Sequence, residues 1–178
     1  MNAHALDVQE VMTDLAGKYL TFHLGEEGYG LEILKVQEII GMQEITKIPK
    51  APDYVKGVIN LRGKVIPVVD LRLKFGMPEQ EISRKTCIIV TQVQRGQSSL
   101  IIGIVVDEVS EVMEISGDQI EPAPAFGTQL NTNFILGMAK TENAVKILLD
   151  IDKVLSADEV AALSSTTDDS EVRAASGD

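Results

Sequence analysis

Histidine and cysteine are the residues most often used for metal binding and nucleophilic catalysis, and this chain has very few of them. It contains two histidines, His4 and His23, and one cysteine, Cys87. None of them forms a C-x-x-C, H-x-x-x-H or H-E-x-x-H pattern, the spacings that bring zinc ligands together. We therefore expect no bound metal and no cofactor.

Two aspartates, Asp70 and Asp150, are the remaining candidates for acid–base chemistry, since a pair of carboxylates can hydrolyse a glycosidic bond. Each of them follows an apolar stretch and precedes a short helical pattern, where Asp typically caps the first turn. No G-x-S-x-G elbow, P-loop or dinucleotide fingerprint accompanies them. We therefore expect a protein that is not an enzyme. The alternative is a small hydrolase or ligand-binding barrel that uses Asp70 or Asp150.

The elements that would position these residues are mainly short strands. Residues 19–24 and 29–33 are apolar at alternate positions and flank the turn sequence GEEG, which predicts a β-hairpin. The stretch GVINLRGKVIPVVDL predicts a second hairpin, with Arg62 at its turn. Because proline lacks an N–H group, Pro67 predicts that its strand lies at a sheet edge or is bulged there.

The chain contains an internal repeat with two offsets. At an offset of 73 residues Gly30 aligns with Gly103, and GLEILKVQEI lies over GIVVDEVSEV. At an offset of 80 residues Gly57 aligns with Gly137, and GVINLRGKVIPVVDL lies over GMAKTENAVKILLDI. Each copy has about five short predicted strands, so we expect an all-β fold of two similar antiparallel barrels joined by short helical turns.

This repeat suggests one domain over residues 18–163, with one barrel at about 30–84, the other at about 85–150, and the chain ends shared between them. Residues 1–17 would be an amino-terminal extension. An S-x-x-E capping box at Ser156 and Glu159 predicts a carboxy-terminal helix. The small polar residues 164–178 predict a disordered acidic tail.

Composition excludes several classes of partner. The formal charge is −11, and the excess lies mainly at the two ends of the chain, so no basic patch for nucleic acid is expected. The longest apolar run, Leu100–Val106, is far shorter than the roughly 20 residues that cross a bilayer. The lone cysteine and the lack of a secretion signal are typical of a cytoplasmic protein that does not insert into the membrane.

Several stretches resemble the bacterial chemotaxis coupling protein family, CheW. They are YGLEILKVQEI, KGVINLRGKVIPVVDLRLKFG, IIGIVVDEVSEV and QIEPAPAF, and N-L-R-G-x-x-x-P-V-x-D-L at residues 60–71 is the most specific. The resemblance covers residues from about 19 to 163. It implies two pseudo-symmetric, five-stranded SH3-like β-barrel subdomains packed around a shared apolar interface.

The resemblance also implies a function as a non-catalytic adaptor. Members of the family join the cytoplasmic tip of methyl-accepting chemotaxis receptors to the regulatory domain of the CheA histidine kinase, in arrays at the membrane. A helix of the receptor would lie between the barrels, its apolar side chains against aliphatic residues and its register fixed by charges at the rim. The positions that match the receptor-binding surface of the family are Val36, Glu38, Ile39, Arg62, Val109 and Val112.

A second contact, with the kinase, would involve the loop that contains Glu121 and Phe126. The same fold also occurs as a module of CheV and CheA proteins, and that is the alternative within the family. Within the repeat, Arg62 aligns with Glu142, a reversal of charge. This reversal makes Arg62 a candidate for recognition of a partner on one side of the molecule only.

Overall fold

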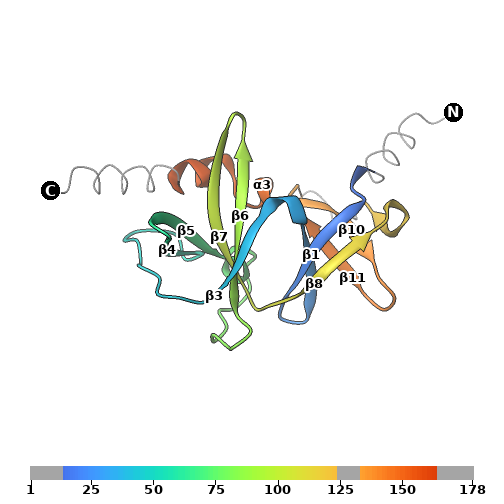
Figure 1. Cartoon of the computed structure of the whole chain (residues 1–178), viewed down its shortest axis with the longest axis horizontal. Helices are drawn as coiled ribbons and strands as arrows, with labels where there is room; N and C mark the ends of the chain where they lie inside the picture. The colour runs from blue at the N-terminus through green and yellow to red at the C-terminus, as the bar shows by residue number, and fades with distance from the viewer. Residues whose placement is uncertain (1–13, 124–132, 164–178) are drawn as a thin grey trace.

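The structure, a computed structural model, describes residues 14–123 and 133–163 and contains two β-sheets (Figure 1). The six-stranded sheet has the order β8-β1-β2-β11-β10-β9, with bounds β1 Gly17–Leu24, β2 Glu27–Glu32, β8 Glu108–Ile115, β9 Ile120–Glu121, β10 Ile135–Lys140 and β11 Val145–Leu149. The five-stranded sheet has the order β3-β6-β7-β5-β4, with bounds β3 Val36–Gly41, β4 Val55–Leu61, β5 Lys64–Asp70, β6 Cys87–Arg95 and β7 Ser98–Val106. The predicted all-β class with two similar units is confirmed.

Short helical segments join the strands. They are the 3-10 turns η1 (Ile33–Lys35) and η2 (Gly117–Gln119), the one-turn helices α2 (Leu71–Lys74) and α3 (Ile151–Val154), and a helix over residues 157–163. The predicted capping box opens the last helix: the Ser156 N–H donates to Glu159 Oε1 over 2.8 Å, and the Glu159 N–H donates to Ser156 Oγ over 3.1 Å. The predicted carboxy-terminal helix is therefore confirmed.

Each sheet takes strands from both halves of the chain. The first half, β1 to β5, gives two strands to the six-stranded sheet and three to the five-stranded sheet. The second half, β6 to β11, gives four strands to the six-stranded sheet and two to the five-stranded sheet. The parallel pairs β5·β7 and β11·β2 tie the halves together. The predicted division between residues 84 and 85 therefore does not match the sheets. The five-stranded sheet runs from Val36 to Val106, and the chain crosses between sheets at η1 and at Asp107.

Strand register supports the repeat alignment. Gly103 lies opposite Val68 in β5·β7, and Gly30 lies opposite Leu148 in β11·β2. A Cβ atom on Gly30 would lie 2.9 Å from Leu148 Cδ2, and one on Gly103 would lie 2.7 Å from Ile88 Cγ2. Both positions therefore need glycine for the same reason: an aliphatic side chain fills the space beside the backbone.

The strand that contains Pro67 is not an edge strand, so that part of the prediction is wrong. β5 lies between β7 and β4, and the bulge in its pairing falls in β4, between Val55 and Gly57. Pro67 pairs with Val58, whose N–H donates to Thr46 O over 2.8 Å instead of to β5. The nitrogen of Pro67 thus faces β7, and pairing with β7 begins only at the next residue, so the strand loses no ladder hydrogen bond.

Within the described residues, three apolar clusters form the interior. The largest lies between the two sheets and also buries Leu155, Val160 and Leu163 from the end of the chain. Each sheet has a smaller core of its own. These are Ile59, Ile66, Val68, Ile88, Val90 and Val105 in the five-stranded sheet, and Tyr19, Ile115, Ile120, Ala139 and Leu148 in the six-stranded sheet. The two sheets therefore share one large core, and each sheet also has a smaller core that it does not share.

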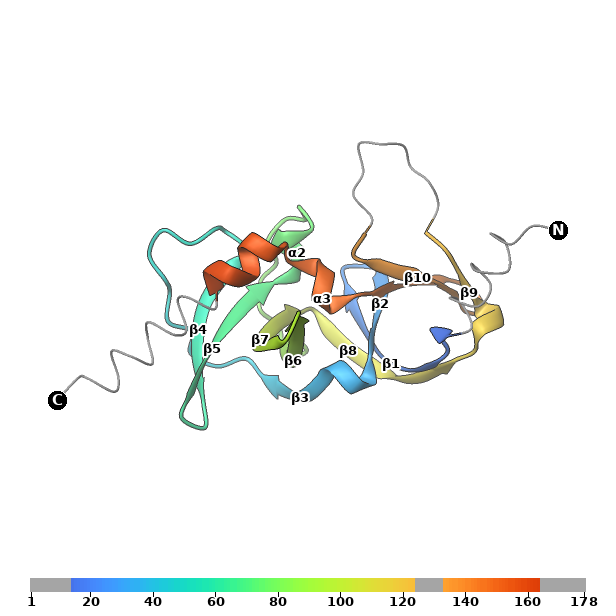
Figure 2. The same cartoon turned by 90° about the horizontal axis from the view of Figure 1, so that it is seen from above.

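The two sides of the molecule are built differently, as Figure 2 shows. α2, α3 and the helix over residues 157–163 lie along the upper side of that view, whereas β3, β1 and β8 lie along the lower side. Within the described ranges, no helix is both long and apolar enough to span a bilayer.

Candidate functional site

Five of the six predicted receptor-binding residues lie on β3 and β8, which occupy equivalent places in the two sheets. Each is the end strand of its sheet and follows directly after the chain has crossed from one sheet to the other. Both run along the lower side of the molecule in Figure 2. The structure therefore brings the predicted residues to one side, and the internal repeat relates them in pairs.

Val36 and Val109 form the inner pair. Val36 lies opposite Thr91 on β6, and Val109 lies opposite Phe22 on β1. Both valines are partly buried and pack against the core between the sheets. They anchor the start of β3 and β8, so a large change at either position is expected to disturb the interior as well as the surface.

Ile39 and Val112 form the outer pair and are more accessible. Ile39 is 45 % exposed and Val112 is 51 % exposed. A third aliphatic residue, Leu34 in η1, is 94 % exposed and was not predicted. The repeat contained a signal for it, because Leu34 aligns with Asp107, so an aliphatic residue stands where the other half has an acid. Three accessible aliphatic side chains thus lie on β3, β8 and the turn that leads into β3.

Arg62 and Glu38, both predicted as rim charges, form an ion pair with each other. Arg62 has a positive φ of 51° in the two-residue turn between β4 and β5, followed by Gly63 at 89°. The Gly63 N–H donates to Asn60 Oδ1 over 2.8 Å, which fixes this turn. The Arg62 guanidinium then reaches across to the Glu38 carboxylate on β3, with Nη1 3.3 Å from Oε2. Its side chain remains 71 % exposed.

The second half of the chain has no counterpart of this ion pair. The repeat aligns Arg62 with Glu142 and Glu38 with Glu111, so two acids stand where the first half has a base and an acid. Glu142 is exposed at the end of the β10–β11 hairpin, and its φ is not positive. The acid is therefore present in both halves, and the base that pairs with it is present only in the first.

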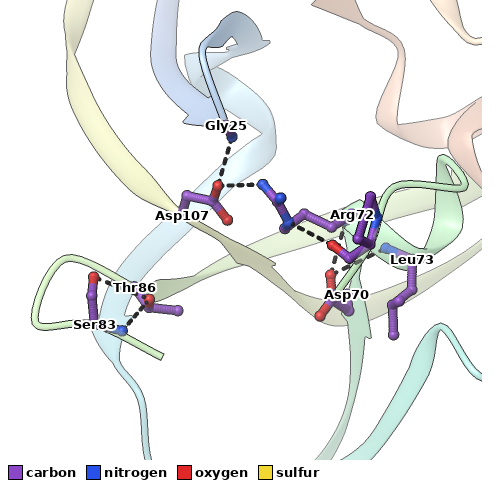
Figure 3. Close-up of polar contacts among 8 residues, drawn as sticks. Gly25, Asp70, Arg72, Leu73, Ser83, Thr86 and Asp107 are labelled. Carbon is purple, nitrogen blue, oxygen red and sulfur yellow. Dashed lines mark hydrogen bonds and ion pairs between the residues drawn. The ribbon is translucent and has the colours of Figure 1, made fainter. Parts of the chain in front are cut away.

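Asp107, where the chain crosses from β7 to β8, holds the two sheets together. Its Oδ2 accepts the N–H of Gly25, in the β1–β2 turn, over 2.6 Å and forms an ion pair with Arg72 Nη1 on α2 over 2.6 Å (Figure 3). Arg72 Nε also donates to Pro78 O over 3.0 Å. This ion pair is more enclosed than the Arg62–Glu38 pair, and it fixes the angle at which β8 leaves the crossing.

The crossing from β2 to β3 has a matching contact. Lys35 Nζ lies 2.8 Å from Asp152 Oδ2 on α3. Asp152 Oδ1 accepts the N–H of Gln94, near the β6–β7 turn, over 2.8 Å. Both edge strands are therefore positioned by a carboxylate that bonds a hairpin N–H and a cation.

Asp70 and Asp150 serve as helix caps, as predicted. Asp70 Oδ1 accepts the N–H groups of Arg72 and Leu73 over 2.9 and 3.3 Å, and Asp150 Oδ1 accepts the N–H of Asp152 over 3.1 Å. Burial raises the pKa of Asp70 despite these hydrogen bonds. Among the residues that the structure describes, no three His, Cys, Asp or Glu side chains gather as metal ligands would. In both aspartates, Oδ1 thus accepts backbone N–H groups at the start of a helix.

The two residues predicted for the kinase contact are only partly covered by the structure. Glu121 ends β9 and forms an exposed ion pair with Lys140 on β10, with 2.8 Å between Oε1 and Nζ. Phe126 lies outside the described residues. A kinase contact at these positions stays a prediction.

Comparison with known proteins places this architecture in a family. The family model described as a CheW-like domain matches residues 18–159. The chain belongs to the CheW-like family. The predicted resemblance is therefore confirmed, and with it a place among the scaffold and adaptor proteins of chemotaxis.

Individual CheW proteins match over most of the chain. The chain is 44 % identical to chemotaxis protein CheW of Klebsiella aerogenes over 144 residues, which are 81 % of this chain and 84 % of that protein. It is 34 % identical to chemotaxis protein CheW of Rhizobium meliloti over 148 residues, 83 % of this chain and 93 % of that one. The crystal structure of the scaffolding protein TtCheW from Thermoanaerobacter tengcongensis superposes with a TM-score of 0.71 at 38 % identity, covering 82 % of this chain and 96 % of TtCheW.

Proposed function

We propose that this protein couples methyl-accepting chemotaxis receptors to the CheA histidine kinase. It would bind the cytoplasmic tip of the receptor on one surface and the regulatory domain of the kinase on another, without catalysing a reaction itself. In this proposal the protein is cytoplasmic and is recruited to receptor arrays at the membrane. Membership of the CheW-like family supports the role of adaptor.

The observation that carries the receptor contact is the surface formed by β3 and β8. Ile39 and Val112 expose aliphatic side chains on equivalent strands, and Leu34 exposes a third in the turn that leads into β3. An amphipathic receptor helix can cover such side chains with its own apolar face, at spacings of three and four residues. Removing this apolar area from water supplies the affinity.

The Arg62–Glu38 ion pair would fix the orientation of that helix. Arg62 is exposed, so its pairing with Glu38 contributes little to folding and the arginine can turn toward an acidic residue of a partner. Because the second half has acids at both equivalent positions, a helix with an acidic residue would be attracted at one end of the surface and repelled at the other. The charges therefore favour one direction of binding over the reverse.

The test is a reconstituted kinase assay with a receptor cytoplasmic fragment, CheA and this protein. We expect the protein to increase receptor-dependent autophosphorylation of CheA, and we expect Arg62→Glu to remove most of that increase. Lys50→Glu is a matched control, because it makes the same change of charge at another exposed residue with a positive φ, 62°, outside β3 and β8. It should leave the increase largely intact.

Two further measurements separate the two contacts. Co-elution with the isolated regulatory domain of CheA should be unchanged in Arg62→Glu, and co-elution with the receptor fragment should be reduced. If both associations fall equally, Arg62 is not specific for the receptor surface. Failure of the unmodified protein to bind either partner would contradict the proposed function itself.

A further inference from the structure

A second apolar groove opens on the side of the molecule opposite β3 and β8. It has a volume of about 390 Å³ and lies between the end of α2 and the start of β10. Phe75 and Phe134 stack in it with ring centroids 5.3 Å apart, and Phe75 also stacks on Tyr29 at 6.0 Å. The lining residues are Tyr29, Lys74, Phe75, Met77, Phe134, Ile135 and Ile147.

The internal repeat supplies a template for what fits there, because the equivalent position in the first half is already occupied. Phe134 corresponds to Tyr54: the Asp150 N–H donates to Phe134 O over 2.8 Å, just as the Asp70 N–H donates to Tyr54 O over 2.7 Å. Beside Tyr54 lies the carboxy-terminal helix of residues 157–163. The helix buries Val160 and Leu163 in the cluster against which Tyr54 packs.

The carboxylate of Glu159 fixes that helix in place. It lies 2.7 Å from Lys74 Nζ on α2 and accepts a hydrogen bond from the Tyr54 hydroxyl. The helix therefore contributes two aliphatic side chains three residues apart and one acid next to them.

The two halves diverge directly after α2 and α3, which explains why one groove is filled and the other open. After α2, the Gly76 N–H donates to Leu73 O and the Met77 N–H donates to Arg72 O, so the chain turns away, with Gly76 at a positive φ of 77°. After α3, Leu155 is extended, and the capping box at Ser156 starts the new helix. No such helix follows α2 in the described chain, and only Phe75 and Met77 of the described segment after α2 line the aromatic groove.

We infer that this groove binds an amphipathic helix of another protein. Like the chain's own carboxy-terminal helix, that helix would carry two aliphatic side chains three residues apart and one acid next to them. The apolar lining would take two aliphatic side chains. A neighbouring hollow of about 250 Å³ continues the groove. It is lined by Lys74, which is already paired with Glu159, and by Lys153. Lys153 is exposed and its Nζ lies as far as 4.0 Å from its nearest acid, Asp150, so it can pair with an acid on the incoming helix.

The test uses the full-length protein and a fluorescent peptide that copies residues 155–163, stapled between positions 157 and 161, which face solvent in the resident helix. We expect saturable binding in fluorescence polarisation. A control peptide with Val160→Ser and Leu163→Ser should bind about tenfold more weakly, because it lacks the apolar anchors.

Three protein variants identify where the peptide binds. Phe134→Ser should weaken binding about tenfold, and Lys153→Glu, an exposed substitution that spares the fold, should weaken it by a smaller factor. Tyr54→Phe removes a hydrogen bond that holds the resident helix and should leave binding unchanged. Tighter binding to Tyr54→Phe, with no effect of Lys153→Glu, would mean that the peptide displaces the resident helix, and this would overturn the inference. Absence of saturable binding would also overturn it.

Discussion

The two places where the chain crosses between the sheets have the same geometry with opposite placement of charge. At the β7–β8 crossing the acid, Asp107, lies in the crossing and the base, Arg72, lies on the helix. At the β2–β3 crossing the base, Lys35, lies in the crossing and the acid, Asp152, lies on the helix. In both, the carboxylate also accepts a hairpin N–H. The fold thus requires the bonded carboxylate but not a particular position for it in the chain.

The turns between the last two strands of each half differ in another way. The Arg62–Glu38 pair has no counterpart, because the equivalent residues are both acids. We expect a contact that supports the fold to be kept in both halves, if necessary with its charges exchanged. We expect a contact that serves recognition, as proposed for Arg62 and Glu38, to occur only once. The predictions below test this distinction, beginning with the largest expected effect.

The two bulge glycines should differ strongly. A Cβ on Gly57 would lie 2.0 Å from Thr46 O, and Gly57 has a positive φ of 142°. A Cβ on Gly137 would lie 2.7 Å from Ile120 Cγ2, an atom that can shift. We expect Gly57→Ala to lower the free energy of unfolding by about 3 kcal/mol or more and Gly137→Ala to lower it by about half as much. Urea unfolding measures both; equal losses would show that the two bulges are equally constrained.

The crossing contacts should come next. Replacing Asp107 by Asn removes an enclosed ion pair and weakens the acceptor for the Gly25 N–H, and we expect a loss of about 2 kcal/mol. Asp152→Asn should cost somewhat less, because its ion pair with Lys35 is more exposed. Thermal and urea unfolding of both variants check this order. A negligible effect of Asp107→Asn would contradict the structural role assigned to that crossing.

Glu159 should make stability depend on pH. Burial would raise its pKa, but hydrogen bonds from Lys74, Tyr54 and Ser156 outweigh burial and lower it to about 2. Since the unfolded pKa is near 4.3, the carboxylate stabilises the fold above about pH 4.5, and this stabilisation is lost as the pH falls toward 2. We expect Glu159→Gln to reduce the loss of stability between pH 5 and pH 2 by about 1–2 kcal/mol.

Glu79 is the matched control for that experiment. The repeat aligns it with Glu159, and hydrogen bonding to Lys56 lowers its pKa, but its side chain is well exposed. Glu79→Gln should leave the pH profile of unfolding nearly unchanged. If both variants flatten the profile equally, the hydrogen bonds of the carboxy-terminal helix are not the cause.

The smallest effect on stability is expected for Arg62→Ala. Its side chain is largely exposed, and its partner Glu38 remains accessible to water. We expect no measurable change in unfolding by urea, together with a clear loss in the receptor-dependent kinase assay. A large loss of stability would show that Arg62 supports the fold, and it would contradict a role confined to recognition.

Local features of the fold could be predicted from the sequence, whereas the pairing of distant strands could not. Arg62-Gly63 predicted its hairpin, and Ser156 with Glu159 predicted the last helix, because turn and cap chemistry depends on a few adjacent residues. The sheet that β6 and β7 join depends on the parallel pair β5·β7, and strand periodicity carries no information about it. For this reason the predicted boundary at residue 84 separates the two repeats but not the two sheets.

The receptor-binding role of the candidate residues stays a prediction, and the structure shows only where they lie. Arg62 and Glu38 were both identified, but their contact joins a turn to a separate strand and could not be read from spacing. Leu34 was missed because an apolar residue between two strands normally packs inside, and only its alignment with Asp107 indicated otherwise. Side-chain exposure is decided by the tertiary path of the chain, which composition and pattern leave open.

The exchange of strands between halves has a consequence for how the chain can be divided. The two repeats of this single chain exchange strands, so their arrangement is that of a strand-exchanged dimer. Residues 75–86 join the two copies. A cut within that connection would break no strand of either sheet, and the resulting fragments would have to associate to complete both. A cut at η1 or at Asp107 would instead release an edge strand together with the surface that it carries. The connection between repeats is thus the natural place to split the protein into two complementing pieces for a reporter of assembly.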